Sequence, residues 1–235
     1  FVRGKVTIIA KTGGERQADV KSEVFLNDRL VSDKASKIEI KFADGSVINL
    51  SENSEMLIDE FVYVSGDKGK ASFAARFFKG AARVVTGAIT KLNPDRFKVR
   101  LRMATVGIRG CEFGMTVTGN SSEVYVLGLG ADETVVVETT SNGKPMNDLA
   151  TGESLTIDEA TRKVVNIDRA GTVLSMKDGV GFDQKTLDKK NMDVFRKTTS
   201  HLPSARYDDV INPDWSVIKV QQPKAGDTEK ENKPQ

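Results

Sequence analysis

Alternation of apolar and polar residues with a period of two constrains this chain more than any other feature of its sequence. In the segment 97–103, FKVRLRM, four apolar residues alternate with three bases, and the segment 37–42, KIEIKF, repeats the pattern. This spacing places the apolar side chains on one face of a β-strand and the charged side chains on the other. The first two-thirds of the chain is therefore predicted to form strands that each bury one face.

Turn residues interrupt these runs at short intervals. Asp44 and Gly45 separate two alternating runs, and glycine supplies the positive φ that a tight hairpin turn requires. Gly119-Asn120 and Asn142-Gly143 are similar signals further along the chain. Many short strands with frequent turns predict a mostly-β fold, either a β-solenoid or a sandwich-like arrangement, rather than alternating β and α units.

Two segments carry less regular patterns. The segment 73–90 is rich in Ala, Phe and Val, but Gly80 and Gly87 would each cost about 1 kcal/mol inside a helix, so we expect strands there. Near the C-terminus, Asp183 stands as a candidate N-cap before a charged segment containing Leu187 and Phe195, which predicts a helix.

These patterns divide the chain into four parts. We expect a β domain over 1–157, a β and loop extension over 158–182, the C-terminal helix over 183–200, and an extended, partly disordered tail over 201–235. No run approaches the roughly 18 apolar residues of a membrane-spanning helix. A transmembrane segment is therefore not predicted.

The residue inventory argues against catalysis and metal binding. The chain has one histidine, His201, and one cysteine, Cys111, and nothing in their spacing supports a nucleophile–base pair. One residue of each kind cannot supply a zinc site. We expect no catalytic residue, no metal and no cofactor, and we interpret Cys111 as a small buried side chain.

Charge is balanced overall but unevenly distributed. The 35 basic and 33 acidic residues give a net charge of +2, which is too balanced for a dedicated nucleic-acid binder. Between Phe42 and Asp67 there are six acids and no base, whereas between Arg76 and Arg109 there are nine bases and one acid. The two blocks could serve as complementary surfaces between molecules, or they could face each other within one fold or simply face solvent. The candidate interaction surface comprises Lys98, Arg100 and Arg102 on the basic side, with Glu52, Glu55, Asp59 and Glu60 on the acidic side.

The run 104–113, ATVGIRGCEF, resembles the hallmark of FecR domains, in which a threonine usually stands at the position of Cys111. The Asp44-Gly45 turn, the segment 79–87 and the segment 150–155 follow the family's order, so the resemblance covers about residues 2–157. Its structural motif comprises Gly107, Arg109, Gly110, Cys111, Phe113, Asp44 and Gly45. We expect the two motif glycines to allow a sharp turn and Arg109 to tie carbonyl groups or a carboxylate across it. The usual threonine and proline before the motif are Arg102 and Met103 here, which is expected to lengthen the basic strand.

The resemblance implies a non-catalytic module of the bacterial envelope that contacts other proteins. We expect a periplasmic location, with a signal peptide outside this numbering. The first hypothesis is a scaffolding subunit of a larger envelope assembly, such as a motor, secretion or surface machine, whose charge blocks make head-to-tail contacts in a homo-oligomer. The alternative is a FecR-type sensing module that relays an outer-membrane signal. An enzyme or a glycan-binding protein is the third hypothesis. Nucleic acid is not among the expected partners.

Overall fold

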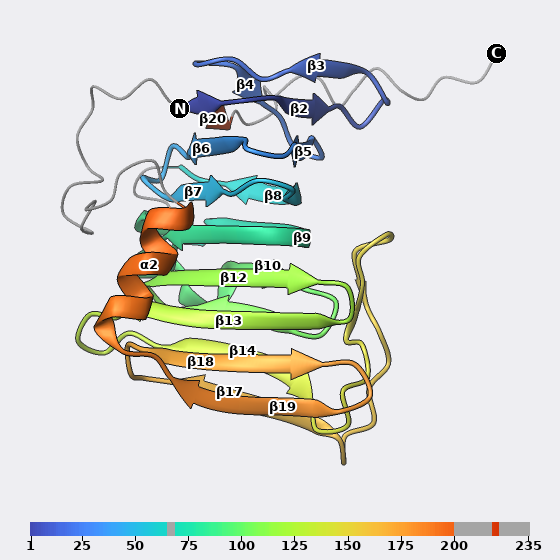
Figure 1. The fold of residues 1–235 in the computed structure, drawn as a ribbon, viewed down its shortest axis with the longest axis vertical. Helices are drawn as coiled ribbons and strands as arrows, with labels where there is room; N and C mark the ends of the chain where they lie inside the picture. Colours follow the sequence, from blue (N-terminus) through green and yellow to red (C-terminus); the bar gives the residue numbers. More distant parts are fainter. Residues whose placement is uncertain (65–68, 200–217, 221–235) are drawn as a thin grey trace.

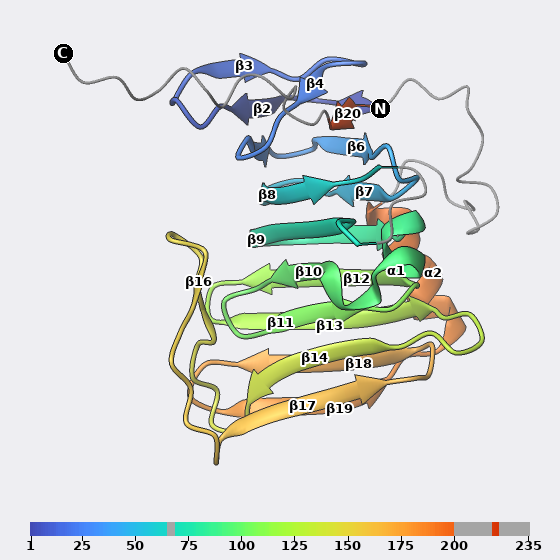
Figure 2. The same cartoon turned by 180° about the vertical axis from the view of Figure 1, so that it is seen from behind.

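The computed structural model describes residues 1–64, 69–199 and 218–220, and they form two β layers packed face to face (Figures 1 and 2). Layer A faces the viewer in Figure 1 and layer B faces the viewer in Figure 2. Strand β9 (Ser72–Val85) belongs to both layers, because its first half pairs within layer B and its second half within layer A. The mostly-β fold predicted from the sequence is confirmed.

Each layer is a ladder of neighbouring strands. Layer A runs in the order β4 (Glu23–Val24), β20 (Ile218–Val220), β6 (Lys37–Lys41), β7 (Val47–Leu50), β9, β12 (Glu112–Thr118), β13 (Ser121–Gly128), β18 (Thr172–Lys177) and β19 (Gly181–Thr186), with β1 (Val2–Arg3) also beside β6. Layer B runs in the order β3 (Glu15–Gln17), β2 (Val6–Ile9), β5 (Arg29–Ser32), β8 (Glu55–Val62), β9, β10 (Phe97–Arg100), β11 (Thr105–Ile108), β14 (Val135–Thr140) and β17 (Arg162–Ile167).

The chain builds these layers from hairpins that alternate between them. Hairpin β10–β11 extends layer B, β12–β13 extends layer A, β14–β17 extends layer B again, and β18–β19 extends layer A. Each hairpin therefore lengthens the molecule along one axis, as Figure 1 shows from blue to orange. The arrangement has the two packed sheets of a sandwich and the stepwise progression of a solenoid.

Four phenylalanines pack against one another in the core between the layers. Phe61, Phe73 and Phe97 are register neighbours on β8, β9 and β10, and each is at most 1% exposed. Phe73 and Phe97 stack with ring centroids 4.4 Å apart, and Phe42 meets Phe61 and Phe73 at 5.3 and 5.2 Å. Such contacts stabilise a core beyond the burial of their area.

Strand β9 crosses from one layer to the other at Gly80, whose φ is +93°. A Cβ at this position would overlap Ser54, which lies directly against the bend. The Ser54 hydroxyl accepts a hydrogen bond from the Ala81 amide at 3.0 Å and donates one to the Ala81 carbonyl at 3.1 Å. The segment expected to form strands does so up to Val85, and α1 (Ala88–Leu92) and a 3-10 helix, η1 (Pro94–Arg96), follow it.

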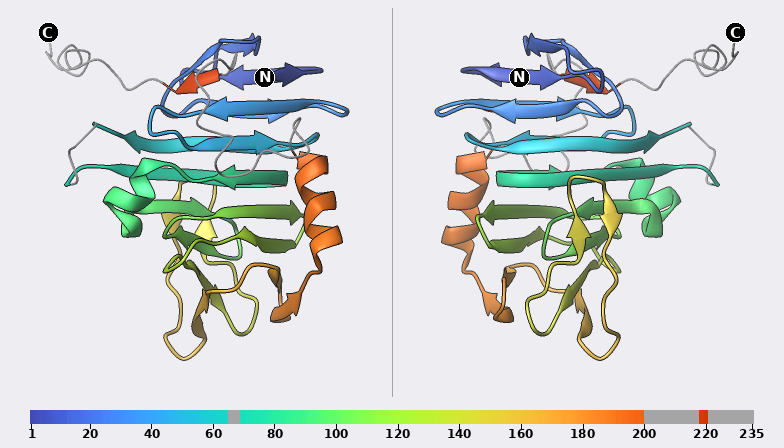
Figure 3. Two further views of the ribbon diagram at one scale, coloured as in Figure 1. Left: turned by 90° about the vertical axis from the view of Figure 1, so that its left-hand side faces the viewer. Right: turned by 90° about the vertical axis from the view of Figure 1, so that its right-hand side faces the viewer.

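The C-terminal helix begins later than the sequence predicted. Residues 183–186 belong to β19, where they pair with β18, and α2 spans Lys189–Thr199. Asp188, rather than Asp183, supplies the cap, because its carboxylate accepts a hydrogen bond from the Asn191 amide at 2.8 Å. Figure 3 shows that α2 runs across the strands of layer A at one side of the molecule.

The basic strand also ends earlier than predicted. Strand β10 stops at Arg100, and Leu101 and Ala104 exchange backbone hydrogen bonds of 2.8 and 3.3 Å that close a tight turn. The Asn147 amide group donates to both carbonyls, at 2.8 and 3.0 Å, and so holds this turn from a distant segment. Arg102 therefore lies in the turn and not on a strand face, and the expected lengthening of the strand is wrong.

The β structure continues across the boundary expected at residue 157. Strand β17 pairs with β14, and β18 pairs with β13, so the segment 158–182 completes both layers. Between β14 and β17, β15 (Asn147–Asp148) and β16 (Glu153–Ser154) form a small separate ribbon. Most of the expected tail, 201–235, lies outside the described residues. Its described part, β20, pairs in parallel with β4 and β6.

Within the described residues, no helix is long and apolar enough to cross a membrane.

We expect replacement of Gly80 by alanine to lower the free energy of unfolding by about 2 kcal/mol or more, because the new Cβ meets both a positive φ and the backbone of Ser54. Urea denaturation measures this change. Gly45→Ala is the matched control, since Gly45 also has a positive φ, +85°, but no atom lies within 4 Å of the added Cβ. A loss no larger than that of the control would contradict the role of the Ser54 contact.

Candidate functional site

The Asp44-Gly45 turn joins β6 and β7, as the sequence predicted, and its side chains hold the segment after β9. The Asp44 carboxylate accepts hydrogen bonds from the Ser46 amide at 3.0 Å and the Ser46 hydroxyl at 2.7 Å. The Ile89 amide reaches the same carboxylate at 3.3 Å, and the Ser46 hydroxyl accepts from the Gly87 amide at 2.8 Å. Burial raises the pKa of Asp44 above its ordinary value, although these donors oppose the shift. The turn is a structural connector.

The second part of the motif, from Gly110 to Phe113, is also structural. Gly110 takes a φ of +82° between β11 and β12, whereas Gly107 lies within β11, so only one of the two motif glycines forms the expected turn. Cys111 is 1% exposed, which confirms that it is a buried side chain. Its amide donates to the Thr86 hydroxyl at 2.9 Å, and its carbonyl accepts from that residue. Burial raises the pKa of the Cys111 thiol well above its ordinary value. Phe113 is fully buried in the core.

The acidic and basic blocks meet within the molecule. The Asp59 carboxylate lies 2.7 Å from Arg76 and 4.0 Å from Arg100, and Glu55 lies 3.5 Å from Lys79. Glu55 also pairs with Arg29 at 3.0 Å. The remaining two acids of the candidate surface bond within the chain, Glu52 to the Ala35 amide and Glu60 to the Ser72 hydroxyl. On the basic side, Arg102 pairs with Asp178 at 3.4 Å, and Lys98 is exposed.

A buried ion cluster attaches α2 to the outer face of layer A. Glu112 accepts hydrogen bonds from Arg196 at 2.8 and 2.9 Å and from Arg83 at 2.7 Å. The side chains of Arg83 and Glu112 are only 3% and 10% exposed. Burial alone would raise the pKa of Glu112, but the hydrogen bonds from Arg196 and the charge of Arg83 outweigh it, so the pKa lies below its ordinary value. Neither the helix contact nor this cluster was predicted from the sequence.

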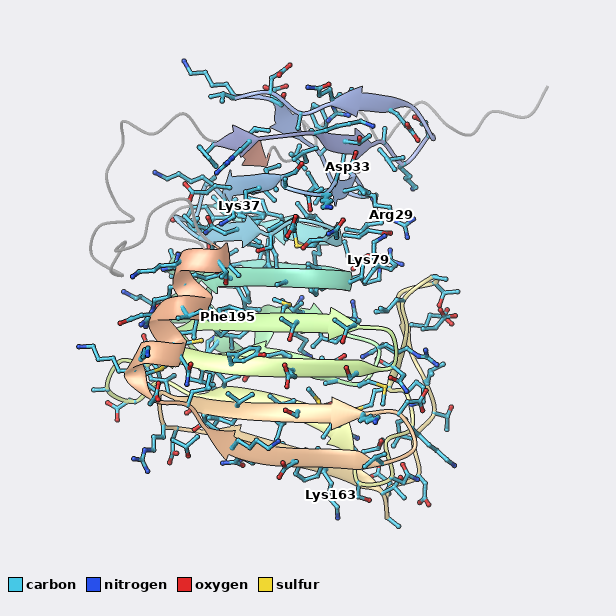
Figure 4. The ribbon with its side chains drawn as sticks, viewed as in Figure 1. Arg29, Asp33, Lys37, Lys79, Lys163 and Phe195 are labelled. Atoms are coloured by element: carbon cyan, nitrogen blue, oxygen red, sulfur yellow. The ribbon has the colours of Figure 1, made fainter. Side chains whose placement is uncertain are left out.

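An aromatic contact completes the attachment of α2. Phe195 packs on Tyr125 with ring centroids 4.5 Å apart and covers Gly114, where a Cβ would overlap its ring. Figure 4 shows Phe195 where the helix lies over layer A. The Tyr125 hydroxyl donates to Glu123, which also accepts from Ser175 at 2.9 Å. Burial, together with this carboxylate, raises the pKa of Tyr125 to about 12.

The outer face of layer B carries a groove of about 210 Å³ beside the motif. We call it the Gly107 groove. Its lining comes from η1, β10, β11 and β14, and from the residue that follows β11: Pro94, Asp95, Lys98, Thr105, Gly107, Arg109, Val136 and Glu138. Lys98, Gly107 and Val136 are register neighbours on three adjacent strands.

The sequence suggested that Arg109 ties the turn of the motif, but the structure shows a different contact. Its guanidinium pairs with Asp95 at 2.9 Å across the groove lining, and both side chains are exposed, at 52% and 76%. The other acid of the lining, Glu138, is held by Arg162 at 3.1 Å. Lys98 forms no ion pair within the described part of the chain. From the sequence, Gly107 and Arg109 were placed in the structural motif and Lys98 in the candidate interaction surface, and the structure brings the three together.

The described part of the chain shows no conformational or packing requirement for glycine at position 107. Its φ is not positive, and the nearest atom to an added Cβ is the Val136 carbonyl oxygen at 3.8 Å, an ordinary contact distance. Glycine within a strand is destabilising by about 0.5–1 kcal/mol relative to alanine. The absent side chain instead leaves the groove open, which marks this position as a candidate binding site.

Comparison with known proteins gives a family match and a structural likeness. A family model described as "FecR protein" matches residues 28–128. A crystal structure of a candidate anti-sigma factor from Parabacteroides distasonis is similar at 15% identity and a TM-score of 0.47, covering 72% of this chain and 64% of that one. A second crystal structure of such a protein from the same organism gives 15% identity and a TM-score of 0.45, with 69% and 61% covered. The chain thus spans less than two-thirds of these proteins. No curated protein matches it.

We expect Glu112→Gln to lower the free energy of unfolding at pH 7 by about 3 kcal/mol, because two arginines lose their carboxylate in a buried site. The pKa of Glu112 is lowered in the folded state, so its stabilising contribution is present above the unfolded value, about 4.3, and is lost as the pH falls through the folded value. The difference between the two proteins should therefore shrink on acidification, as measured by urea denaturation across pH. Asp33→Asn removes an exposed ion pair with Lys5 and should cost at most about 1 kcal/mol. Equal losses in both variants would contradict the role of the buried cluster.

We expect Cys111 to resist a water-soluble thiol reagent in the native protein and to react fully in denaturant, because the thiol is buried and its pKa is raised. A Lys163→Cys variant in a Cys111→Ser background should react at once, since position 163 is exposed. Absorbance of the released thiolate measures both. Rapid labelling of native Cys111 would show that the site opens readily.

Proposed function

The chain contains a FecR domain, and from that premise we propose that it is a non-catalytic sensing module that binds another envelope protein in the periplasm and relays an outer-membrane signal. The observation that carries this proposal is the family match over residues 28–128, which runs from the residue before β5 to the end of β13. That span contains strand β9, the aromatic core and most of the lining of the Gly107 groove.

The positions of the charges favour sensing over scaffolding. A head-to-tail scaffold would need one molecule to present its acidic block to the basic block of the next. Asp59 and Glu55 already pair with bases of the second block within one chain. An intermolecular contact would have to replace these pairs. The acidic and basic blocks therefore give little support to assembly of this chain into a filament or ring.

Three buried ionisable groups with shifted pKa values support a non-catalytic role. Asp44, Cys111 and Glu112 owe their shifts to burial and to partners that hold β-strands or α2 in place. Perturbed groups at a catalytic site would instead converge on an accessible cavity. None of the three lines the Gly107 groove.

Cross-linking in intact cells of the natural host, followed by mass spectrometry of the purified complex, tests this proposal. We expect links to one membrane partner and no links between copies of this chain. The double variant Arg100→Glu/Arg102→Glu serves as the comparison. A scaffold built on the basic block would lose its self-links in that variant, whereas a sensor would show none in either protein. Self-links in the natural protein, accompanied by several envelope proteins, would overturn the sensing role and restore the scaffold.

A further inference from the structure

We propose that the Gly107 groove binds an acidic side chain carried by an extended segment of the partner protein. This inference rests on the proposed function, because it names the chemistry by which a protein partner is recognised. The groove measures about 210 Å³, below the roughly 300–1,000 Å³ of pockets for drug-sized ligands. It therefore suits a single side chain better than a free small molecule.

Space for this side chain comes from Gly107. On either side of it in register stand Lys98 on β10 and Val136 on β14. A Cβ at position 107 would fit without a clash, because the nearest atoms are those of Val136, at 3.8 Å or more. The backbone of β11 is thus accessible at this point, while the lysine and valine side chains border it.

Lys98 gives the groove a positive charge that attracts an anion. Lys98 is exposed and has no ion-pair partner within the described residues. Behind it on the same layer, Arg76 and Arg100 are register neighbours that share one carboxylate, Asp59. This local excess of positive charge raises the attraction for a carboxylate at Lys98.

Arg109 provides the second contact through exchange of its present partner. Its pair with Asp95 is exposed on both sides, and exposed pairs contribute only about 0–1 kcal/mol. An incoming carboxylate can take the place of Asp95 on the guanidinium at little cost. Asp95 thus acts as an internal competitor. The second acid of the lining, Glu138, pairs with Arg162 at 3.1 Å.

The test uses the full chain, labelled with ¹⁵N, and a short peptide of alternating serine and aspartate. The peptide is acetylated and amidated, so its carboxylates come from side chains alone. Amide resonances should shift at Lys98, Gly107 and Arg109 as peptide is added. A peptide with asparagine in place of aspartate should cause no such shifts.

Four variants make the test specific. Lys98→Glu should weaken binding by about tenfold or more, and Gly107→Val should abolish it without lowering the melting temperature, because valine fills the groove and suits a strand. Asp95→Asn should strengthen binding by up to about fivefold, since it removes the competitor. Lys163→Glu makes the same change in charge on β17 but at a position outside the groove lining, near the far end of the molecule (Figure 4), and should leave affinity unchanged.

Shifts confined to the groove, with these four effects, support the proposal. It is overturned if the peptide does not bind, if it binds elsewhere, or if Lys98→Glu and Lys163→Glu weaken binding equally. It is also overturned if Asp95→Asn weakens binding. Failure here, together with a single cross-linked partner in cells, would reject the groove and leave the sensing role in place. Self-linked assemblies in cells would instead reject the proposed function.

Discussion

The crossing of β9 between the two layers is the constraint on which the rest of the structure depends. Its first half aligns Phe73 with Phe61 and Phe97 in layer B, and its second half pairs with β7 and β12 in layer A. One strand can pair within both layers only if it bends, and β9 bends at Gly80. Beside this bend, the Ser54 hydroxyl forms hydrogen bonds with the amide and the carbonyl of Ala81. Every later hairpin is then added to the edge of one of the two layers that β9 joins. Two β layers packed face to face in this way enclose a core about 10 Å thick.

Two glycines on the outer faces of the layers have different consequences. Gly114 in layer A lies under Phe195, so its missing side chain lets α2 approach the sheet, and the Glu112 cluster holds the helix there. Among the described residues no side chain covers Gly107 in layer B as Phe195 covers Gly114, so its missing side chain leaves a groove. Part of layer A is therefore closed by the chain itself, whereas the motif face of layer B stays accessible to another molecule.

The sequence could predict the strands because period-two alternation indicates which face is buried, as on β10 up to Arg100; on β6 the strand is correct, but Glu39 is buried as well as Ile38 and Ile40. It could also predict the Asp44-Gly45 turn and the burial of Cys111, which depend on local chemistry. The early end of β10 depends on Asn147, more than forty residues away, and the start of α2 depends on pairing between β18 and β19. Such long-range contacts leave no periodic signal. The groove was missed for the same reason, since its lining residues meet only when β10, β11 and β14 lie side by side.

Strand order also bears on how the charges of the two blocks are paired. Strands β8, β9 and β10 are neighbours, so the acids of β8 face the bases of β9 and are neutralised there. Asp59 of β8 also reaches Arg100 on β10, but Lys98 on that strand forms no ion pair within the described residues and keeps its charge beside Gly107. Asp95, an acid of the groove lining, is paired with Arg109 in an exposed pair that water and salt weaken. Buried charges such as those of Arg83 and Glu112 are thus held in ion pairs shielded from water, whereas Arg109 in the groove is held in a pair exposed to water. An external carboxylate can compete for a base in such an exposed pair.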